Sequence, residues 1–154
     1  MAISVRLIGV PTDINSSFAR GAALAPARIR AALWSDRGNL ACENGLEIGN
    51  GITLADGGDL PLAEDPAADD LLIAASVRDT LRLGAAPILL GGDHSITLPA
   101  LRAMHEHFGP VTILHFDAHP DLYDDFEGNP RSHASPFARI MEERLAARLI
   151  QVGI

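Results

Sequence analysis

Cysteine is nearly absent from this sequence, which has one, Cys42, among 154 residues. A single cysteine cannot form a disulfide within the chain, so a disulfide-stabilised secreted scaffold is excluded and a reducing compartment is expected. The first ten residues lack a basic segment followed by a long apolar stretch, so no secretory signal peptide is predicted. We therefore expect a cytoplasmic protein.

Long apolar runs and basic residues are also scarce. No apolar run approaches the roughly 20 residues that a membrane-spanning helix needs, so no membrane partner is expected. The chain has 12 Lys and Arg against 20 Asp and Glu, which gives a formal net charge of −8. An acidic chain is poorly suited to phosphate backbones, so a nucleic-acid partner is not expected. The charge weakly favours cationic ligands, although it also serves solubility.

The composition that remains is that of a globular protein. Hydrophobic residues make up 47% and charged residues 21% of the chain, and its length suits one domain with a sizeable core. The sequence contains no internal repeat, low-complexity segment or convincing linker. We therefore expect a single domain rather than two.

Short apolar segments alternate with helical patterns along the chain. Strands are predicted over residues 5–10, 87–90, 111–116 and 148–152, with a weaker candidate at 51–54. Helices are predicted over residues 26–34, from Pro66 (with Asp65 as N-cap) to Gly84, over 98–108 (with Thr97 as possible cap), and from Pro136 to about 147. The alternation of strand and helix predicts an α/β fold with a parallel sheet.

Two polar clusters directly follow two of these strands. Residues 91–95 are Gly-Gly-Asp-His-Ser, after the strand at 87–90, and residues 117–121 are Asp-Ala-His-Pro-Asp, after the strand at 111–116. In open α/β sheets, ligands bind at the carboxyl ends of the strands. If these two strands are neighbours, both clusters face one crevice.

The second cluster has the residue types of a metal site. In extended backbone, Asp117, His119 and Asp121 alternate and point to the same side. Two carboxylates and an imidazole without cysteine favour manganese, magnesium or zinc, and His94 can add a fourth ligand. Either cluster alone also fits a solvated loop, but their shared position at strand ends favours metal binding. Dinucleotide-binding and phosphate-loop glycine patterns are absent.

The other histidines are weaker candidates. His105 and His107 lie on the helix predicted at 98–108 and are expected at the surface. His115 lies within a strand, either as a satisfied core residue or as a support for the metal ligands. His133 lies in a polar loop before a helix, where it is either a proton-transfer group or an ordinary loop histidine.

Both clusters resemble the first two metal signatures of the ureohydrolases, the arginase and agmatinase family. Residues 21–30, 132–137 and 151–154 also resemble segments of this family, and 132–137 resembles the agmatinase-type segment. The resemblance implies a three-layer α/β/α sandwich around a parallel sheet, truncated before its C-terminal strands.

The resemblance also implies a reaction and its residues. It implies two Mn²⁺ ions, with Asp117 bridging both, His94 and Asp121 completing one side, and His119 binding the other ion. A metal-bound hydroxide would attack the guanidinium carbon of a small cationic guanidino substrate, releasing urea and an amine. Asp117 and His133 would be the catalytic residues, with His133 moving a proton or orienting the substrate. A homo-oligomer is weakly implied.

The family's third signature, with two further metal-binding aspartates, is not in the sequence. We therefore expect residues 1–154 to form a single incomplete ureohydrolase domain that releases little urea by itself. Agmatine is the favoured substrate because of residues 132–137. Arginine, formiminoglutamate and guanidino acids remain alternatives, as do a single-zinc hydrolase of related fold and a non-catalytic metal-binding module.

Overall fold

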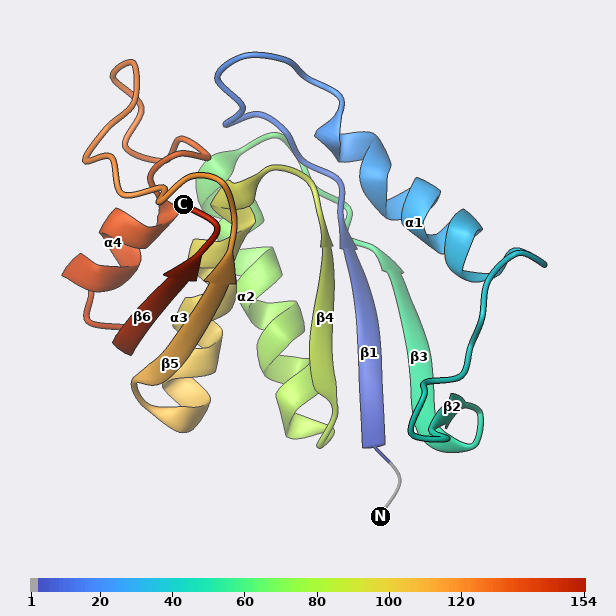
Figure 1. Cartoon of the computed structure of the whole chain (residues 1–154). Coiled ribbons are helices and arrows are strands. Elements are labelled where there is room, and N and C mark those ends of the chain that lie inside the picture. The colour runs from blue at the N-terminus through green and yellow to red at the C-terminus, as the bar shows by residue number, and fades with distance from the viewer. Residues whose placement is uncertain (1–2) are drawn as a thin grey trace.

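The computed structural model describes residues 3–154 as an α/β fold in which the strands pair in parallel (Figure 1). Residues 1 and 2 lie outside the described residues. They belong to the first ten residues, for which no signal peptide was predicted. The strands are β1 (Ile3–Val10), β2 (Glu47–Ile48), β3 (Gly51–Asp59), β4 (Ala86–Gly91), β5 (Val111–Phe116) and β6 (Ala146–Val152). The helices are α1 (Ala25–Leu33), α2 (Pro66–Arg82), α3 (Thr97–Phe108) and α4 (Pro136–Glu142).

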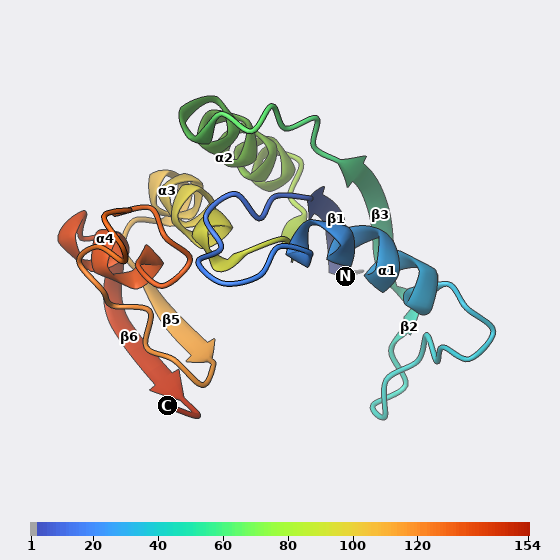
Figure 2. The same ribbon diagram turned by 90° about the horizontal axis from the view of Figure 1, so that it is seen from above.

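The strands form two sheets within the described residues. One has the order β2-β3-β1-β4 and the other contains β5 and β6. Helices α2, α3 and α4 cover one side of the strands, whereas α1 lies on the other side, against β1 and β4 (Figure 2). This arrangement confirms the predicted α/β fold with a parallel sheet. Within residues 3–154, no helix is long and apolar enough to cross a membrane.

The core lies between the strands and helices α2 to α4. Ile73, Val77 and Leu81 lie four residues apart, and therefore on one face of α2, and are buried with exposures of 2%, 0% and 8%. Ile73 packs near Ile8 of β1, and Val77 packs near Ala103 of α3. Burying a side chain of this size contributes roughly 1.5–3 kcal/mol, so the helix is held by its apolar stripe.

The helix starts follow the predicted signals in one case and not in another. The Asp65 carboxylate accepts the backbone N–H groups of the first turn of α2, as an N-cap does, so that prediction is confirmed. Thr97 is not a cap: it is the first residue of α3, and no side chain caps the helix. A side-chain cap is found just before this helix, at the short 3-10 turn His94–Ile96. There the Asp93 carboxylate accepts the backbone N–H of Ser95.

The last helix is shorter than predicted. Instead of continuing to about residue 147, α4 ends at Glu142. Arg144 takes a left-handed conformation with φ of 56°, and the backbone N–H of Leu145 then bonds to the carbonyl of Ile140. This geometry turns the chain back toward the sheet. Buried apolar residues at 145–146, which extend the helical pattern in the sequence, instead lead into β6.

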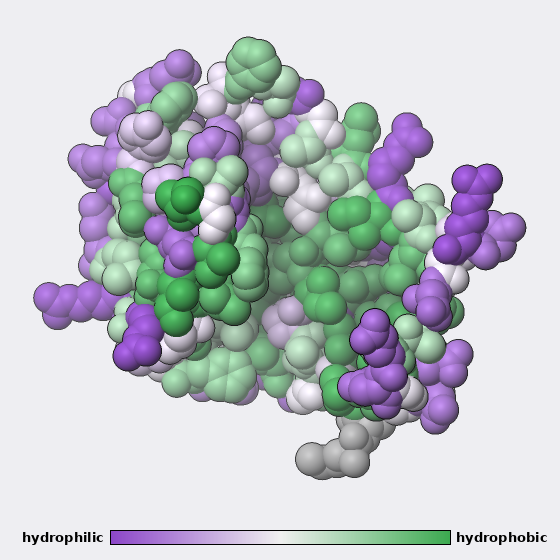
Figure 3. Space-filling view, viewed as in Figure 1, coloured by the Kyte–Doolittle hydropathy of each residue, from purple (hydrophilic) through white to green (hydrophobic). Residues whose placement is uncertain are grey.

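One face of β4, β5 and β6 carries exposed apolar side chains. Because side chains alternate along a strand, Ile113 and Leu149 pack beneath α3 and α4, while their neighbours point to the opposite side. Figure 3 shows apolar side chains gathered in the hollow between the two sheets. The exposed members on these strands are Ile88, Leu114, Phe116, Ile150 and Val152.

Candidate metal centre

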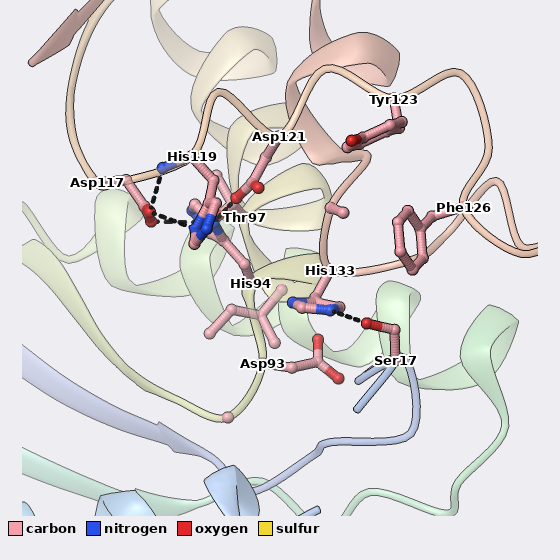
Figure 4. A pocket seen from close by; sticks show the side chains of 13 residues that line it. Ser17, Asp93, His94, Thr97, Asp117, His119, Asp121, Tyr123, Phe126 and His133 are labelled. Carbon is pink, nitrogen blue, oxygen red and sulfur yellow. Dashed lines mark hydrogen bonds and ion pairs between the residues drawn. The ribbon is translucent and has the colours of Figure 1, made fainter. Parts of the chain in front are cut away.

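The carboxyl ends of β4 and β5 face a common pocket although the strands are not paired. β4 pairs with β1, and β5 pairs with β6. The two strands are therefore not hydrogen-bonded neighbours, which was the condition for both clusters to face one crevice. The loops that follow them nevertheless converge on a cavity of about 560 Å³ (Figure 4). Residues of both predicted clusters line it, including His94, Asp117, His119 and Asp121.

Four side chains form a group that can hold a metal ion. One ligand atom from each of His94, His115, Asp117 and Asp121 lies within 4.8 Å of all the others. His94 Nδ1 is 2.6 Å from Asp121 Oδ2 and 3.8 Å from Asp117 Oδ2. The Nε2 atom of His115 is 3.4 Å from Asp117 Oδ2. Carboxylate oxygens and imidazole nitrogens without thiolate suit manganese, magnesium or zinc.

His119 lies beside this group rather than within it. Its side chain is 78% exposed, and its Nδ1 is 3.5 Å from Asp117 Oδ1. The backbone after β5 is not extended: it bends at residues 118–119, and Asp121 has a φ of 48°. The extended backbone that the prediction assumed is therefore absent, although Asp117, His119 and Asp121 all line the same pocket. Asp117 has imidazoles beside both carboxylate oxygens, with His119 near Oδ1 and with His94 and His115 near Oδ2.

The Asp117 carboxylate is held in its ionised form. The backbone N–H of His119 donates to Asp117 Oδ1 over 2.9 Å, and this bond lowers the pKa of Asp117. Burial opposes the lowering, and the nearby imidazoles of His94 and His115 support it. Because the pKa falls on folding, this carboxylate stabilises the fold above its unfolded pKa, and that contribution is lost as pH falls through the folded pKa. At neutral pH the group is thus available to a cation.

His115 joins the cluster because of strand alternation and the packing behind it. It lies two residues before Asp117 and is 7% exposed. Its ring packs against Phe137 of α4, with ring centroids 4.3 Å apart, and Phe137 also meets the ring of His94 at 5.4 Å. The sequence predicted either a support for the metal ligands or a core residue. The structure places the His115 ring beside Asp117, with Phe137 packed against it.

His133 lines the same pocket from the loop before α4. Its Nε2 is hydrogen-bonded with the hydroxyl of Ser17 over 2.8 Å, and its backbone N–H donates to the carbonyl of Asn15. Figure 4 shows a dashed line between His133 and Ser17, whereas no such line joins His133 to His94 or Asp117. Of the other two histidines, His107 is exposed as predicted, whereas His105 is half-buried.

Asn15 ties the pocket loops together, a role that the sequence did not reveal. This buried residue donates its backbone N–H to Asp93 Oδ2 over 3.0 Å and its side-chain amide to Ser95 Oγ over 3.1 Å. Its Oδ1 accepts from the Asn129 amide over 3.2 Å. Through Asn15, the segment 12–23 joins the loop after β4 to the loop that carries His133.

The glycine pair after β4 allows a close crossing of two backbones. Gly92 has a φ of 62°, and a Cβ atom there would lie 2.5 Å from the Val10 carbonyl oxygen and 2.6 Å from that of Thr12. A side chain would therefore force β4 away from the end of β1. The close crossing at Gly92 lets the chain lead directly into His94, which lines the pocket.

Fold and site together define a parallel α/β protein with a histidine–aspartate cluster at its strand ends that could hold a metal ion. The family model for arginases matches residues 3–154. The chain belongs to the arginase family, as its two signatures predicted.

Relatives of known function bear this out. The chain is 48% identical to the mitochondrial arginase of Medicago truncatula over 100% of its length and 48% of the relative's. It is 50% identical to the mitochondrial arginase 1 of Arabidopsis thaliana, over 98% of this chain and 46% of the other. The solved Medicago truncatula arginase superposes with a TM-score of 0.90, covering 99% of this chain and 50% of that one. The chain thus spans about half the length of these relatives.

Two predictions are corrected by these relatives. The preference for agmatinase is not supported, because the mitochondrial agmatinase of Gallus gallus is only 35% identical, over 99% of this chain and 45% of its own length, against 48–50% for the plant arginases. The identity over the whole chain therefore does not follow the agmatinase-type resemblance of residues 132–137. The cytoplasmic location is contradicted, since the similar arginases are mitochondrial. A single cysteine excludes an internal disulfide, but it does not say which reducing compartment holds the protein.

Proposed function

We propose that the protein containing this chain hydrolyses the guanidinium group of arginine to urea and an amine at a pair of manganese ions. The observation that carries the proposal is the position of Asp117, which has imidazole nitrogens beside both of its carboxylate oxygens. One carboxylate oxygen lies 3.8 Å from His94 Nδ1 and the other 3.5 Å from His119 Nδ1. A carboxylate with a different imidazole beside each oxygen is suited to bridge two cations.

The residues fit manganese by their chemistry. His94, Asp121 and one oxygen of Asp117 would hold one ion, and His119 and the other oxygen of Asp117 would contribute to the second. Asp121 is buried, and its closest partner is the His94 ring at 2.6 Å, so a carboxylate oxygen and an imidazole nitrogen lie close enough to share one cation. When bound, two such ions act as Lewis acids that lower the pKa of a water molecule.

The pocket suits a positively charged substrate group. Asp93, Asp117 and Asp121 line it, and none of the described lining residues is Lys or Arg. A guanidinium group is planar, cationic and rich in N–H donors, which carboxylates accept well. Arginine and agmatine carry the same guanidinium group, so the pocket residues suit both. The 48–50% identity to plant arginases supports arginine.

His133 is proposed to move a proton during the reaction. It lines the pocket on the side away from the metal cluster, and its Nε2 is already hydrogen-bonded with Ser17. An imidazole exchanges protons near neutral pH, so it can receive one from the attacking water or return one to the leaving amine. Its loop is anchored through Asn15 and Asn129, which holds the ring at the pocket.

Manganese counting tests the site, and a chimaera tests the activity. After manganese loading and desalting, elemental analysis of the purified chain is expected to give at least one ion, held by His94, Asp117 and Asp121. The chain joined to the C-terminal half of the Medicago truncatula arginase is expected to hold two ions and to release urea from arginine faster than from agmatine. The chain alone is expected to release little urea.

Each outcome separates the competing functions. One zinc and no manganese pair in the chimaera would support a single-zinc hydrolase instead. A full metal count without urea from any guanidino compound would support a non-catalytic metal-binding module. Faster turnover of agmatine or of formiminoglutamate would keep the reaction class but replace the substrate.

Replacing His133 tests proton transfer apart from metal binding. In the chimaera, His133→Ala is expected to lower the rate constant for urea release by about 100- to 10,000-fold, the usual contribution of a general acid or base. The manganese count is expected to stay unchanged, because His133 lies outside the ligand group. His107→Ala, an exposed histidine on α3, is the matched control and should keep full turnover. An equal loss of metal and rate in His133→Ala would contradict the assignment.

A further inference from the structure

His115 stands among the metal-ligating side chains, yet its hydrogen bonds indicate a different role. The decisive neighbour is Gln151 of β6, whose side-chain nitrogen lies 2.7 Å from the Pro120 carbonyl oxygen and 3.1 Å from His115 Nδ1. The partner strands bring these groups together, since His115 and Gln151 are directly paired in the β5–β6 register.

These two distances fix the orientation of the Gln151 amide. A backbone carbonyl can only accept a hydrogen bond, so the amide atom beside Pro120 must be the nitrogen that donates. That nitrogen carries two hydrogens and cannot accept. Its second hydrogen therefore points to Nδ1 of His115, which must offer a lone pair.

The protonation of His115 follows from this contact. A neutral imidazole with a lone pair on Nδ1 carries its hydrogen on Nε2. The Nε2 atom is buried, has no hydrogen-bond partner within residues 3–154, and lies 3.4 Å from Asp117 Oδ2. It is thus a donor that faces a carboxylate.

We propose that His115 is a positioning residue that directs its Nε2–H at Asp117, and that it does not ligate manganese. The inference rests on the proposed manganese site. A nitrogen that carries hydrogen has no lone pair for a cation, so the ligands are left to His94, Asp117, His119 and Asp121. A ligating carboxylate with a second, hydrogen-bonded partner keeps its orientation, and loss of such a partner typically weakens metal affinity by about 10- to 100-fold. The contact needs only a small movement of Asp117 to reach hydrogen-bond length.

The tautomer can be observed directly in the 154-residue chain without metal. Two-bond ¹⁵N–¹H correlations of the imidazole, assigned by comparison with His115→Gln, are expected to show hydrogen on Nε2 and a bare Nδ1. Gln151→Glu offers an acceptor in place of the donor and is expected to move the hydrogen to Nδ1. A wild-type ring with hydrogen on Nδ1 would overturn the proposal, whatever the protein does with metal.

Metal titration separates support from ligation. At saturation, His115→Ala and His115→Gln are expected to hold as many manganese ions as the wild type, with affinity about 10- to 100-fold lower for the alanine variant and partly restored by the glutamine amide. His94→Ala is expected to lose an ion, and His107→Gln to change nothing. Loss of an ion in both His115 variants would overturn the proposal. If the wild type bound no manganese, the proposed function would fail. The NMR measurement on the metal-free chain would still show whether His115 directs Nε2–H at Asp117.

Discussion

Asp117→Asn is expected to abolish manganese pairing and to reduce urea release by the chimaera to background. The substitution keeps the size of the side chain and an oxygen that can still accept the backbone N–H of His119, so the local turn is preserved. It removes the negative charge that the structure favours, as the lowered pKa of Asp117 shows. It also removes the ability to face two cations at once, because an amide offers one oxygen and one N–H₂ group.

The measurement is thermal unfolding with and without manganese. A ligand that binds only the folded chain stabilises it by about 2.7 kcal/mol at 100 times its dissociation constant. We expect the wild-type melting temperature to rise with added Mn²⁺ and that of Asp117→Asn to stay constant. Asp36→Asn neutralises an exposed carboxylate far from the pocket in sequence and is the charge-matched control. A normal manganese response in Asp117→Asn would remove Asp117 from the site.

The strands and the metal clusters were predictable because their signals are local. Short, mainly apolar segments such as 111–116 predict strands. The Asp65–Pro66 pair marks the start of α2 by a cap that depends on adjacent backbone only. The two clusters follow strands directly, so the fold alone brings His94 and Asp117 to one end. These parts of the site follow from spacing.

The remaining features depend on contacts between distant segments. Asn15 lies 78 residues from Asp93 and 114 from Asn129, and no periodic pattern connects them. The direction of His119 depends on the bend after β5, which the Asp117 carboxylate stabilises by accepting a backbone N–H. The role of His115 depends on Gln151, a residue of the next strand. The sequence shows which polar side chains are present, whereas tertiary packing decides which of them form hydrogen bonds with each other.

The same distinction explains the separation of β4 and β5. Each strand satisfies the local pattern of a buried parallel strand, and each pairs on one side within the described residues. The pocket forms without hydrogen bonds between them because the loops after both strands are joined by Asn15 and by the 121–135 segment. The site is therefore organised by loop contacts as much as by the sheet.

Phe137→Ala is expected to destabilise the chain by about 3–5 kcal/mol, the usual cost of truncating a buried phenylalanine. Phe137 is 2% exposed and packs with Leu98, Ile140 and Leu145 between α3, α4 and β6. Such a loss is a large part of the total stability of a single domain. Chemical denaturation followed by circular dichroism measures it, and Phe108→Ala, at a side chain 59% exposed, is the control that should cost far less.

Phe137 also links stability to the metal centre. Its ring contacts those of His94 and His115, so the cavity left by alanine lies directly behind the ligand group. We expect weaker manganese affinity in Phe137→Ala even under conditions where the variant is folded, because the two imidazoles lose the surface that fixes their rotamers. Phe137→Leu fills part of the cavity and should recover part of both losses. A stability loss near that of Phe108→Ala, or an unchanged manganese affinity, would show that the imidazoles are held by their polar partners alone.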